Sequence, residues 1–412
     1  MPRTFAVAIL AVSLFGHAPD ARADVVLEWN AIMVSTVSSQ NPFAQGRLAA
    51  ITQLAVFEAV NAIEGGYRPY LGTIVAPGGA SAEAAAVAAA HTVLRNYLPA
   101  AGAGLDSARA TSLARIPEGA AKTSGIAVGE AAAAALIAHR LDDGAAPPAF
   151  HVPGPAEPGE WQATPGCPPA GGVLAHWGGV APFGIPSADR FRSDPPPPLS
   201  SPRYAHAYNE VKSVGSLDST FRPSHKANVA RFFNAVLAVA TWNPAVSQVA
   251  AARRTSLAQN ARLLALLNMA ISDGLVAVME TKYHYTFWRP ETAIPSGETD
   301  GNVKTEADPA FVPFITTPCF PGYGSAHAAA SFAARRIAEA FFGDTGVSVV
   351  LSHPAVPGVA LEYESFEEIT RDIDDARVYG GIHFRFDQQA GGRQGRRIGT
   401  WIYRHHLRPA RD

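Results

Sequence analysis

A stretch dense in proline, residues 144–202, constrains this 412-residue chain more than any other feature. Proline lacks a backbone N–H and disrupts helices and inner strands, so the stretch has no regular structure of its own. Its prolines include Pro147, Pro148, Pro153, Pro155, Pro158, Pro165, Pro168, Pro169, Pro182, Pro186 and the run Pro195 to Pro198. It also holds Trp161, Trp177 and Phe183, and a disordered linker would be poor in such aromatic residues. We predict an ordered excursion that packs on the body and forms part of an entrance; a flexible linker is the alternative.

On both sides of this stretch, apolar residues recur at helical spacing, as Leu48, Ile51, Leu54 and Phe57 do. Helices are predicted over 25–37, 46–63, 80–97, 103–115, 119–142, 203–215, 223–240, 244–268, 269–286, 325–342, 365–384 and 388–406. No segment alternates polar and apolar residues as a half-buried strand does. The fold is therefore predicted to be mainly α, with two packed helical bundles, 24–143 and 203–412, on either side of the proline-rich stretch.

The first 23 residues have the features of a secretory signal peptide. Arg3 gives a positive start, residues 5–15 are apolar, and Ala21-Arg22-Ala23 fits a small-x-small cleavage site. The apolar run is too short to cross a membrane, so an uncleaved anchor is the weaker alternative. The mature chain, 24–412, is predicted to be secreted or periplasmic, and it has no run of 18 consecutive apolar residues that would predict a span.

Charge and cysteine content narrow the possibilities further. The formal net charge of −2 provides no basic surface, so nucleic acid is not an expected partner. The chain has two cysteines, Cys167 and Cys319. They could pair in an oxidising compartment, but the sequence does not show whether they lie close enough, and pairing stays open.

Two cations, Lys282 and Arg289, stand seven residues apart in the sequence. On one helix this spacing puts them on the same face, two turns apart, and Pro290 would end that helix. Aromatic residues lie between them, which makes the alternative, a solvated basic face, less favoured. Cations held in apolar surroundings need an anion, and an arginine fork beside a lysine suits a phosphate-like oxyanion.

A turn rich in proline and glycine, residues 318–324, precedes the predicted helix at 325–342. Ser325 would cap this helix, and the free N–H groups of its first turn make an anion site next to His327. The alternative is a plain helix cap without a ligand.

A third cluster contains Arg377, His383 and Asp387. Residues four apart face one another on a helix, so the Asp387 carboxylate could hold one imidazole nitrogen of His383. The other nitrogen would then be free to attack a substrate or bind a metal, with Arg377 as a further fork donor. A surface ion pair among neighbouring charges is the alternative.

In order, these segments have the pattern Lys-x6-Arg-Pro, Ser-x-His and Arg-x5-His-x3-Asp. The pattern resembles the signature of the vanadium-dependent haloperoxidases and the type 2 phosphatidic acid phosphatase superfamily, in its secreted bacterial haloperoxidase-like branch. The motif-bearing region, 282–387, covers about a quarter of the chain, and the helical pattern extends the likeness over nearly all the rest. Gly324 stands where the signature has Pro, Ala326 where it has Gly and Ala376 where it has Ser; Ala326 still keeps its N–H.

The resemblance implies a cofactor-binding set around one vanadate, in a site that phosphate can also occupy: Lys282, Arg289, Ser325, Ala326, His327, Arg377 and His383. The three cations would neutralise oxygens, and the serine hydroxyl and the Ala326 N–H would donate hydrogen bonds. His383 would be the vanadium ligand, Asp387 would orient it, and His327 would be the acid–base group on the opposite side. The catalytic residues would thus be His327, His383 and Asp387.

The resemblance implies vanadate-dependent oxidation of halide by hydrogen peroxide, giving hypohalous acid. A cradle for vanadate also suits a phosphoryl-transfer transition state, so a phosphomonoesterase with a phosphohistidine on His383 is one alternative. A non-catalytic phosphate- or vanadate-binding relic is another; a membrane lipid phosphatase is disfavoured. Phe320 matches the chloride-oxidising members, whereas Met279 stands where they have an aromatic residue, so these two candidates for the halide environment leave the halide open.

Overall fold

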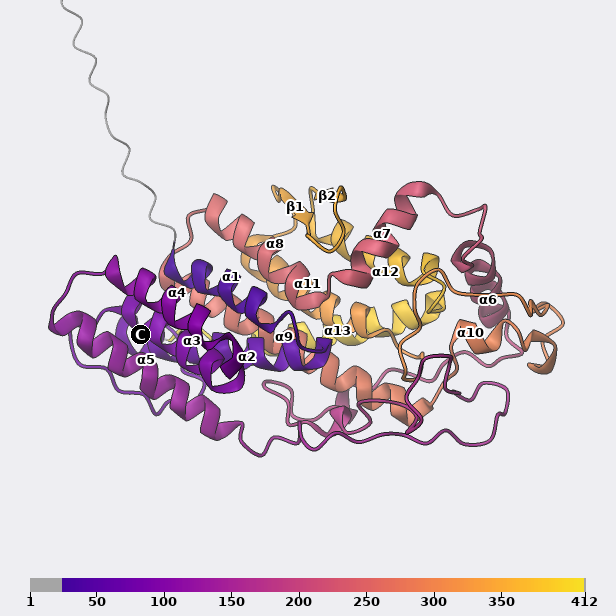
Figure 1. Ribbon diagram of the computed structural model, residues 1–412, viewed down its shortest axis with the longest axis horizontal. Coiled ribbons are helices and arrows are strands. Elements are labelled where there is room, and N and C mark those ends of the chain that lie inside the picture. The colour runs from indigo at the N-terminus through magenta and orange to yellow at the C-terminus, as the bar shows by residue number, and fades with distance from the viewer. Residues whose placement is uncertain (1–23, 411–412) are drawn as a thin grey trace, which may run out of the picture.

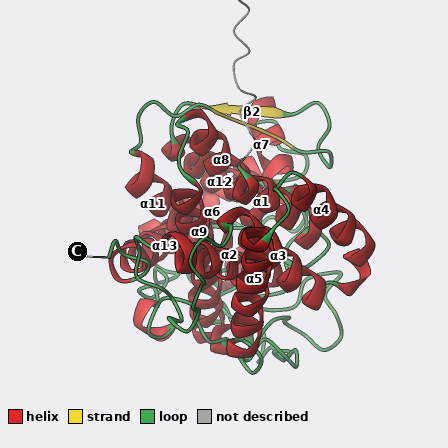
Figure 2. Ribbon diagram, turned by 90° about the vertical axis from the view of Figure 1, so that its left-hand side faces the viewer, coloured by secondary structure: helices red, strands yellow, loops and turns green. Residues whose placement is uncertain are grey.

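The computed structural model describes residues 24–410, and the expected signal peptide, 1–23, lies outside them. The longest helix of the described part is α9 (Leu257–Tyr285), which runs through the middle of the molecule (Figure 2). A capping box starts it: Ser256 Oγ accepts the Gln259 N–H, and the Gln259 side chain accepts the Ser256 N–H. The two helices predicted at 244–268 and 269–286 are wrong, because this cap and the buried apolar residues after it make one continuous helix.

Five helices precede the proline-rich stretch and gather at one end of the molecule (Figure 1). They are α1 (Val25–Val37), α2 (Pro42–Glu64), α3 (Ala82–Tyr97), α4 (Gly102–Ala114) and α5 (Ala120–His139). Helix α2 packs along α9 and α3, and α3 packs along α5. A Cβ atom on Gly129 of α5 would lie 2.2 Å from the Ala85 carbonyl oxygen of α3, so glycine is required for this close approach.

Residues 144–202 are ordered and lie against the body, as predicted, with Trp161 and Trp177 buried. Two short 3-10 turns, Trp177–Gly179 and Asp189–Phe191, are their helical elements. The fully buried carboxylate of Asp273 on α9 anchors the stretch, accepting the backbone N–H groups of residues 183, 184 and 185 at 2.6, 2.7 and 2.9 Å. A carboxylate can be buried there because these donors replace water.

A disulfide joins Cys167 to Cys319, with the Cα atoms 5.4 Å apart. The pairing that the sequence left open is therefore made. A backbone hydrogen bond next to it, from the Val173 N–H to the Cys319 carbonyl at 2.9 Å, strengthens the same junction. Together they tie the proline-rich stretch to the turn that precedes the Ser325 segment.

After the proline-rich stretch the chain is again mainly helical, which confirms the predicted fold class. The further helices are α6 (Pro202–Gly215), α7 (Ser224–Ala235), α8 (Ala238–Ala252), α10 (Pro290–Ala293), α11 (Ala326–Phe342), α12 (Phe366–Tyr379) and α13 (Arg385–His405). The single helix predicted at 223–240 is wrong, because the chain is extended at Val236 and bends by 103° between α7 and α8. A short antiparallel hairpin, β1 (Val349–Ser352) with β2 (Ala360–Tyr363), was not predicted.

Helices α11 and α13 pack backbone to backbone through glycines spaced four apart on α13. Added Cβ atoms would lie 2.4 Å from the Ser325 carbonyl oxygen at Gly391, 2.2 Å from that of Ala329 at Gly395, and 2.5 Å from an α11 carbonyl at Gly399. This contact sets the distance between the start of α11 and the start of α13, which carry two of the predicted motifs.

Two described helices, α5 and α9, are long and apolar enough to cross a membrane, and the bent α7–α8 pair would add a third. The expectation of no span, based on uninterrupted apolar runs, overlooked them because each contains charged residues. The most apolar part of α9 is 94% buried inside the protein, against 39% for α5. The protein core therefore accounts for the apolar character of α9.

Candidate active site

The first motif begins in the last turn of α9, where Lys282 lies, but Arg289 lies outside that helix. Thr286 turns the chain with a left-handed conformation, φ 44°, and the next residues pair with the proline-rich stretch: the Trp288 N–H donates to the Gly159 carbonyl at 2.9 Å. The prediction that both cations share one helix face is therefore wrong. The helix ends at Tyr285, and the residues after it pair with a distant segment instead of continuing the helix. The two side chains are nevertheless both fully buried.

Backbone carbonyls of the 318–324 turn accept hydrogen bonds from both cations. Lys282 Nζ donates to the Pro321 and Gly322 carbonyls at 2.7 and 2.8 Å, and Arg289 Nε donates to the Phe320 carbonyl at 3.0 Å. Within residues 24–410 neither cation has a carboxylate partner in an ion pair. Burial, and then Arg289, lower the pKa of Lys282 well below its usual range, and burial lowers the pKa of Arg289 to about 10. The site therefore holds positive charge that nothing fully compensates.

The second motif forms the start of α11. Ser325 Oγ accepts the Ala328 N–H at 3.3 Å, so the residue is a helix cap, and its hydroxyl hydrogen is left to donate. The Ala326 N–H, first in the helix, has no intrahelical acceptor. Ala326 is not among the residues with positive φ, so alanine replaces the glycine of the signature without backbone strain. His327 follows in the same turn.

The third motif is split between α12, which carries Arg377, and the start of α13. His383 precedes α13, so the prediction that it shares a helix with Asp387 is wrong; the carboxylate instead reaches back from the first turn. Asp387 Oδ2 accepts from His383 Nδ1 at 2.9 Å and from the Phe384 N–H at 3.0 Å. This carboxylate assigns the proton to Nδ1, so Nε2 is unprotonated, and its lone pair accepts from Arg289 Nη1 at 2.9 Å.

Burial dominates the electrostatics of the histidines. Burial, then Arg289 and Lys282, lower the pKa of His383 well below its usual range, and burial with Arg377 does the same for His327. Burial raises the pKa of Asp387 to about 7, while Lys282 and Arg289 oppose that rise. Both imidazoles are therefore neutral near pH 7.

Three buried nitrogen atoms of this site have no hydrogen-bond partner in the described structure: Arg289 Nη2, Arg377 Nε and His327 Nε2. Arg377 uses Nη1 for the Phe233 carbonyl at 3.1 Å, and burial, with Arg289, lowers its pKa to about 9. An unsatisfied buried polar group costs about 1–3 kcal/mol, so three in one place need an explanation. An anion with several oxygen acceptors would supply partners for the arginine nitrogens and the missing charge, and vanadate fits that description.

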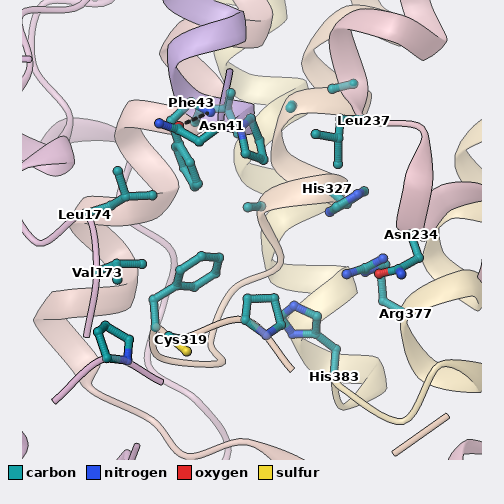
Figure 3. A pocket seen from close by; sticks show the side chains of 18 residues that line it. Asn41, Phe43, Val173, Leu174, Asn234, Leu237, Cys319, His327, Arg377 and His383 are labelled. Carbon is teal, nitrogen blue, oxygen red and sulfur yellow. Dashed lines mark hydrogen bonds between the residues drawn. The ribbon is translucent and has the colours of Figure 1, made fainter. Parts of the chain in front are cut away.

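A cavity of about 420 Å³ opens beside these groups. One side of it is lined by His327 on α11, Arg377 on α12 and His383, just before α13 (Figure 3). Phe320 also lines it and lies 5.2 Å from both Lys282 Nζ and the Arg289 guanidinium, measured to the ring centre. Lys282, Arg289 and Ser325 are fully buried and do not line it. Met279 is fully buried one turn before Lys282 and does not line the cavity.

Part of the cavity wall was not predicted from the sequence. Phe43 of α2 and Leu237, between α7 and α8, line it, as does Val173 of the proline-rich stretch. Pro168 and Leu174 of that stretch line the cavity as well, and the role of the stretch as part of an entrance stays a prediction. Phe43 and Leu237 lie far from the motifs in sequence, and an isolated apolar residue carries no local signal that it faces a cavity.

The chain is similar to known proteins in its C-terminal domain and in its fold. Residues 262–412 match the family model described as the VCPO second helical-bundle domain. The fold is similar to that of the first bacterial vanadium-dependent iodoperoxidase, with a TM-score of 0.78 and 23% identity over 94% of this chain and 97% of that one. It is also similar to a holo-type bacterial vanadium-dependent chloroperoxidase, with a TM-score of 0.73 and 16% identity over 88% of this chain and 91% of that one. A search of curated proteins finds no match. Residues 262–412 are therefore similar to the VCPO second helical-bundle domain, and the chain shares its fold with these bacterial vanadium-dependent peroxidases.

Proposed function

We propose that this protein is a vanadate-dependent haloperoxidase, which uses hydrogen peroxide to oxidise a halide to hypohalous acid. One observation carries the proposal. The site combines two buried guanidinium nitrogens without a partner in the described structure, Arg289 Nη2 and Arg377 Nε, with the unprotonated Nε2 of His383. The similarity of the fold to an iodoperoxidase and a chloroperoxidase supports the same activity.

Vanadate would be held by the residues with free donors or charge in this site: Lys282, Arg289, Ser325, Ala326, Arg377 and His383. His383 Nε2 would be the ligand to vanadium. Bound vanadate would supply Lewis-acid activation of hydrogen peroxide without changing its own oxidation state. Phosphate, with the same oxygen acceptors, would compete for the same donors.

The side chains around it have distinct tasks. Lys282, Arg289 and Arg377 stabilise negative charge on oxygen in a region with little water, where such interactions are strong. Asp387 keeps the His383 proton on Nδ1, which maintains Nε2 as a donor of electrons. His327 is neutral near pH 7, so it can accept a proton from peroxide and return it to the departing oxygen. The net reaction consumes one halide, one hydrogen peroxide and one proton and yields hypohalous acid and water.

No comparison favours the phosphomonoesterase or the non-catalytic relic. The halide is not assigned: Phe320 borders the cavity, and Met279 does not.

We further propose that the protein is exported and water-soluble. The features of residues 1–23 support export, and the disulfide between Cys167 and Cys319 fits an oxidising compartment. N-terminal sequencing of protein from the periplasm or medium would test this; a start near Asp24 is expected, and an intact Met1 would contradict it.

The activity is tested with purified protein, orthovanadate, hydrogen peroxide and iodide or bromide. We expect halide oxidation that saturates with vanadate and is lost in His383→Ala. It should be retained in Arg385→Met, because the Arg385 guanidinium pairs with Glu210 and Asp375 and not with the residues proposed to hold vanadate. A parallel assay follows hydrolysis of a phosphomonoester without vanadate. Hydrolysis without any halide oxidation would refute the proposal.

A further inference from the structure

The residues proposed to hold vanadate form a cradle, and the cavity beside this cradle is larger and more apolar than peroxide and halide require. Among residues 24–410, the charged or titratable side chains that line it are His327, Arg377 and His383, all on one side. The remaining wall is apolar, apart from two exposed asparagines, Asn41 and Asn234. The apolar lining is drawn from separate parts of the chain: Phe43, Val173, Leu237, Leu275, Pro318 and Phe320. A volume of about 420 Å³ lies within the range of sites that bind small organic molecules.

The wall is also held in place before anything binds. The disulfide and the Val173–Cys319 backbone hydrogen bond fix the proline-rich stretch beside the 318–320 turn. The Phe43 ring packs edge-on against Phe320, with centroids 5.9 Å apart. A preformed wall lowers the ordering cost of binding, which favours a true ligand site.

The charges on one side restrict the ligand. A cation would meet Arg377 without a compensating carboxylate, because no acidic residue of the described part of the chain lines the cavity. An anion would compete with the oxyanion for the cradle. A neutral, apolar molecule is therefore the chemical class that fits, and it must be electron-rich if it is to react with an oxidised halogen.

We propose that this cavity binds the organic acceptor, a neutral apolar aromatic compound, and that halogen is transferred to it inside the protein. This inference rests on the proposed function for its chemistry, although the binding site itself does not. In the transfer, a ring carbon gives an electron pair to the halogen of hypohalous acid, and the oxygen–halogen bond breaks. The departing hydroxide takes the ring proton, so the products are the halogenated ring and water.

The test uses variants that fill the cavity without touching the cradle. Val173→Phe and Leu237→Phe fill it from two independent sides, and Val303→Phe, at a fully exposed site, is the matched control. The first measurement is binding of 2-naphthol to the vanadate-free protein, followed by its fluorescence. The second is competition between 2-naphthol and the polar phenol N-acetyltyrosinamide for halogenation, referenced to the same competition with added hypobromous acid.

We expect 2-naphthol to bind, with an affinity that falls about tenfold or more in both filling variants and is unchanged in the control. We also expect enzymatic halogenation to favour 2-naphthol about tenfold more than free hypobromous acid does, with this preference lost in the filling variants. Equal binding in all variants, no binding, or a preference equal to that of free hypobromous acid would overturn the inference. Binding that is lost in the filling variants, with no halide oxidation by any form, would uphold the apolar site and refute the haloperoxidase function instead.

Discussion

Replacing Arg377 by methionine should stabilise the anion-free protein and at the same time weaken vanadate binding. Arg377 is only 3% exposed, has a buried Nε without a partner in the described structure, and lies near another buried cation, Arg289. Replacing a side chain that only stabilises the fold would instead destabilise the protein and leave vanadate binding unchanged. The two opposite signs therefore separate a cofactor-binding residue from a structural one.

The expected gain in the free energy of unfolding follows from the charge of the buried side chain. Burial, and then Arg289, lower the pKa of Arg377 from 12.5 to about 9. At about 1.36 kcal/mol per pH unit, keeping it charged costs the folded protein roughly 5 kcal/mol. The variant loses the 3.1 Å hydrogen bond to the Phe233 carbonyl. An unsatisfied carbonyl costs about 1–3 kcal/mol, which leaves a net gain of roughly 2–4 kcal/mol.

The assay is denaturant unfolding in buffer free of phosphate and vanadate, followed by vanadate titration at equilibrium. Vanadate affinity should fall about a hundredfold, because one charged donor of a buried cradle is removed. Arg385→Met is the control: that guanidinium is paired with Glu210 and Asp375, so its loss should destabilise the protein and leave vanadate affinity unchanged. A destabilised Arg377→Met protein with unchanged vanadate affinity would refute the reasoning.

Three further predictions concern pH, the disulfide and helix packing. The folded pKa of His327 is lowered, so the unfolded chain binds a proton that the folded protein does not, and stability should fall by about 1.4 kcal/mol per pH unit below about pH 6.5. His327→Gln should remove that increment of slope from vanadate-free unfolding curves; an unchanged slope would contradict it. The Cys167–Cys319 bridge spans 152 residues of sequence, so Cys167→Ser combined with Cys319→Ser should lower the unfolding free energy by about 3–5 kcal/mol, and equal denaturant midpoints would count against this. Gly395→Ala places a Cβ 2.2 Å from an α11 carbonyl and should lower stability by about 2–4 kcal/mol, whereas Gly104→Ala, with open space in α4, should be neutral or stabilising; calorimetry that ranks them the other way would contradict the packing account.

Much of the candidate site could be predicted because its chemistry depends on residue type and order. Lys282, Arg377 and His383 come from separate elements, yet each motif has charged groups that apolar surroundings would not tolerate without a ligand. The mainly helical fold followed from apolar spacing, and the ordered proline-rich stretch followed from its aromatic residues. These signals are local in sequence, so one chain is enough to detect them.

The parts that failed depend on contacts between distant segments. The helix containing Lys282 ends at Tyr285, before residues that pair with residues 159–161, and no local breaker marks that point. His383 lies outside α13, although its spacing from Asp387 suits a helix. The disulfide requires a distance of a few ångströms between segments far apart in the chain. The glycines of α13 were a usable signal, since their four-residue spacing predicts close helix packing.

The most direct test of the central claim is X-ray absorption at the vanadium edge of the vanadate-loaded protein. We expect one nitrogen ligand among oxygens, provided by His383 Nε2. That nitrogen should disappear in His383→Ala and persist in Arg385→Met. Coordination by oxygen alone in the unmodified protein, or a nitrogen ligand that survives in His383→Ala, would contradict the account.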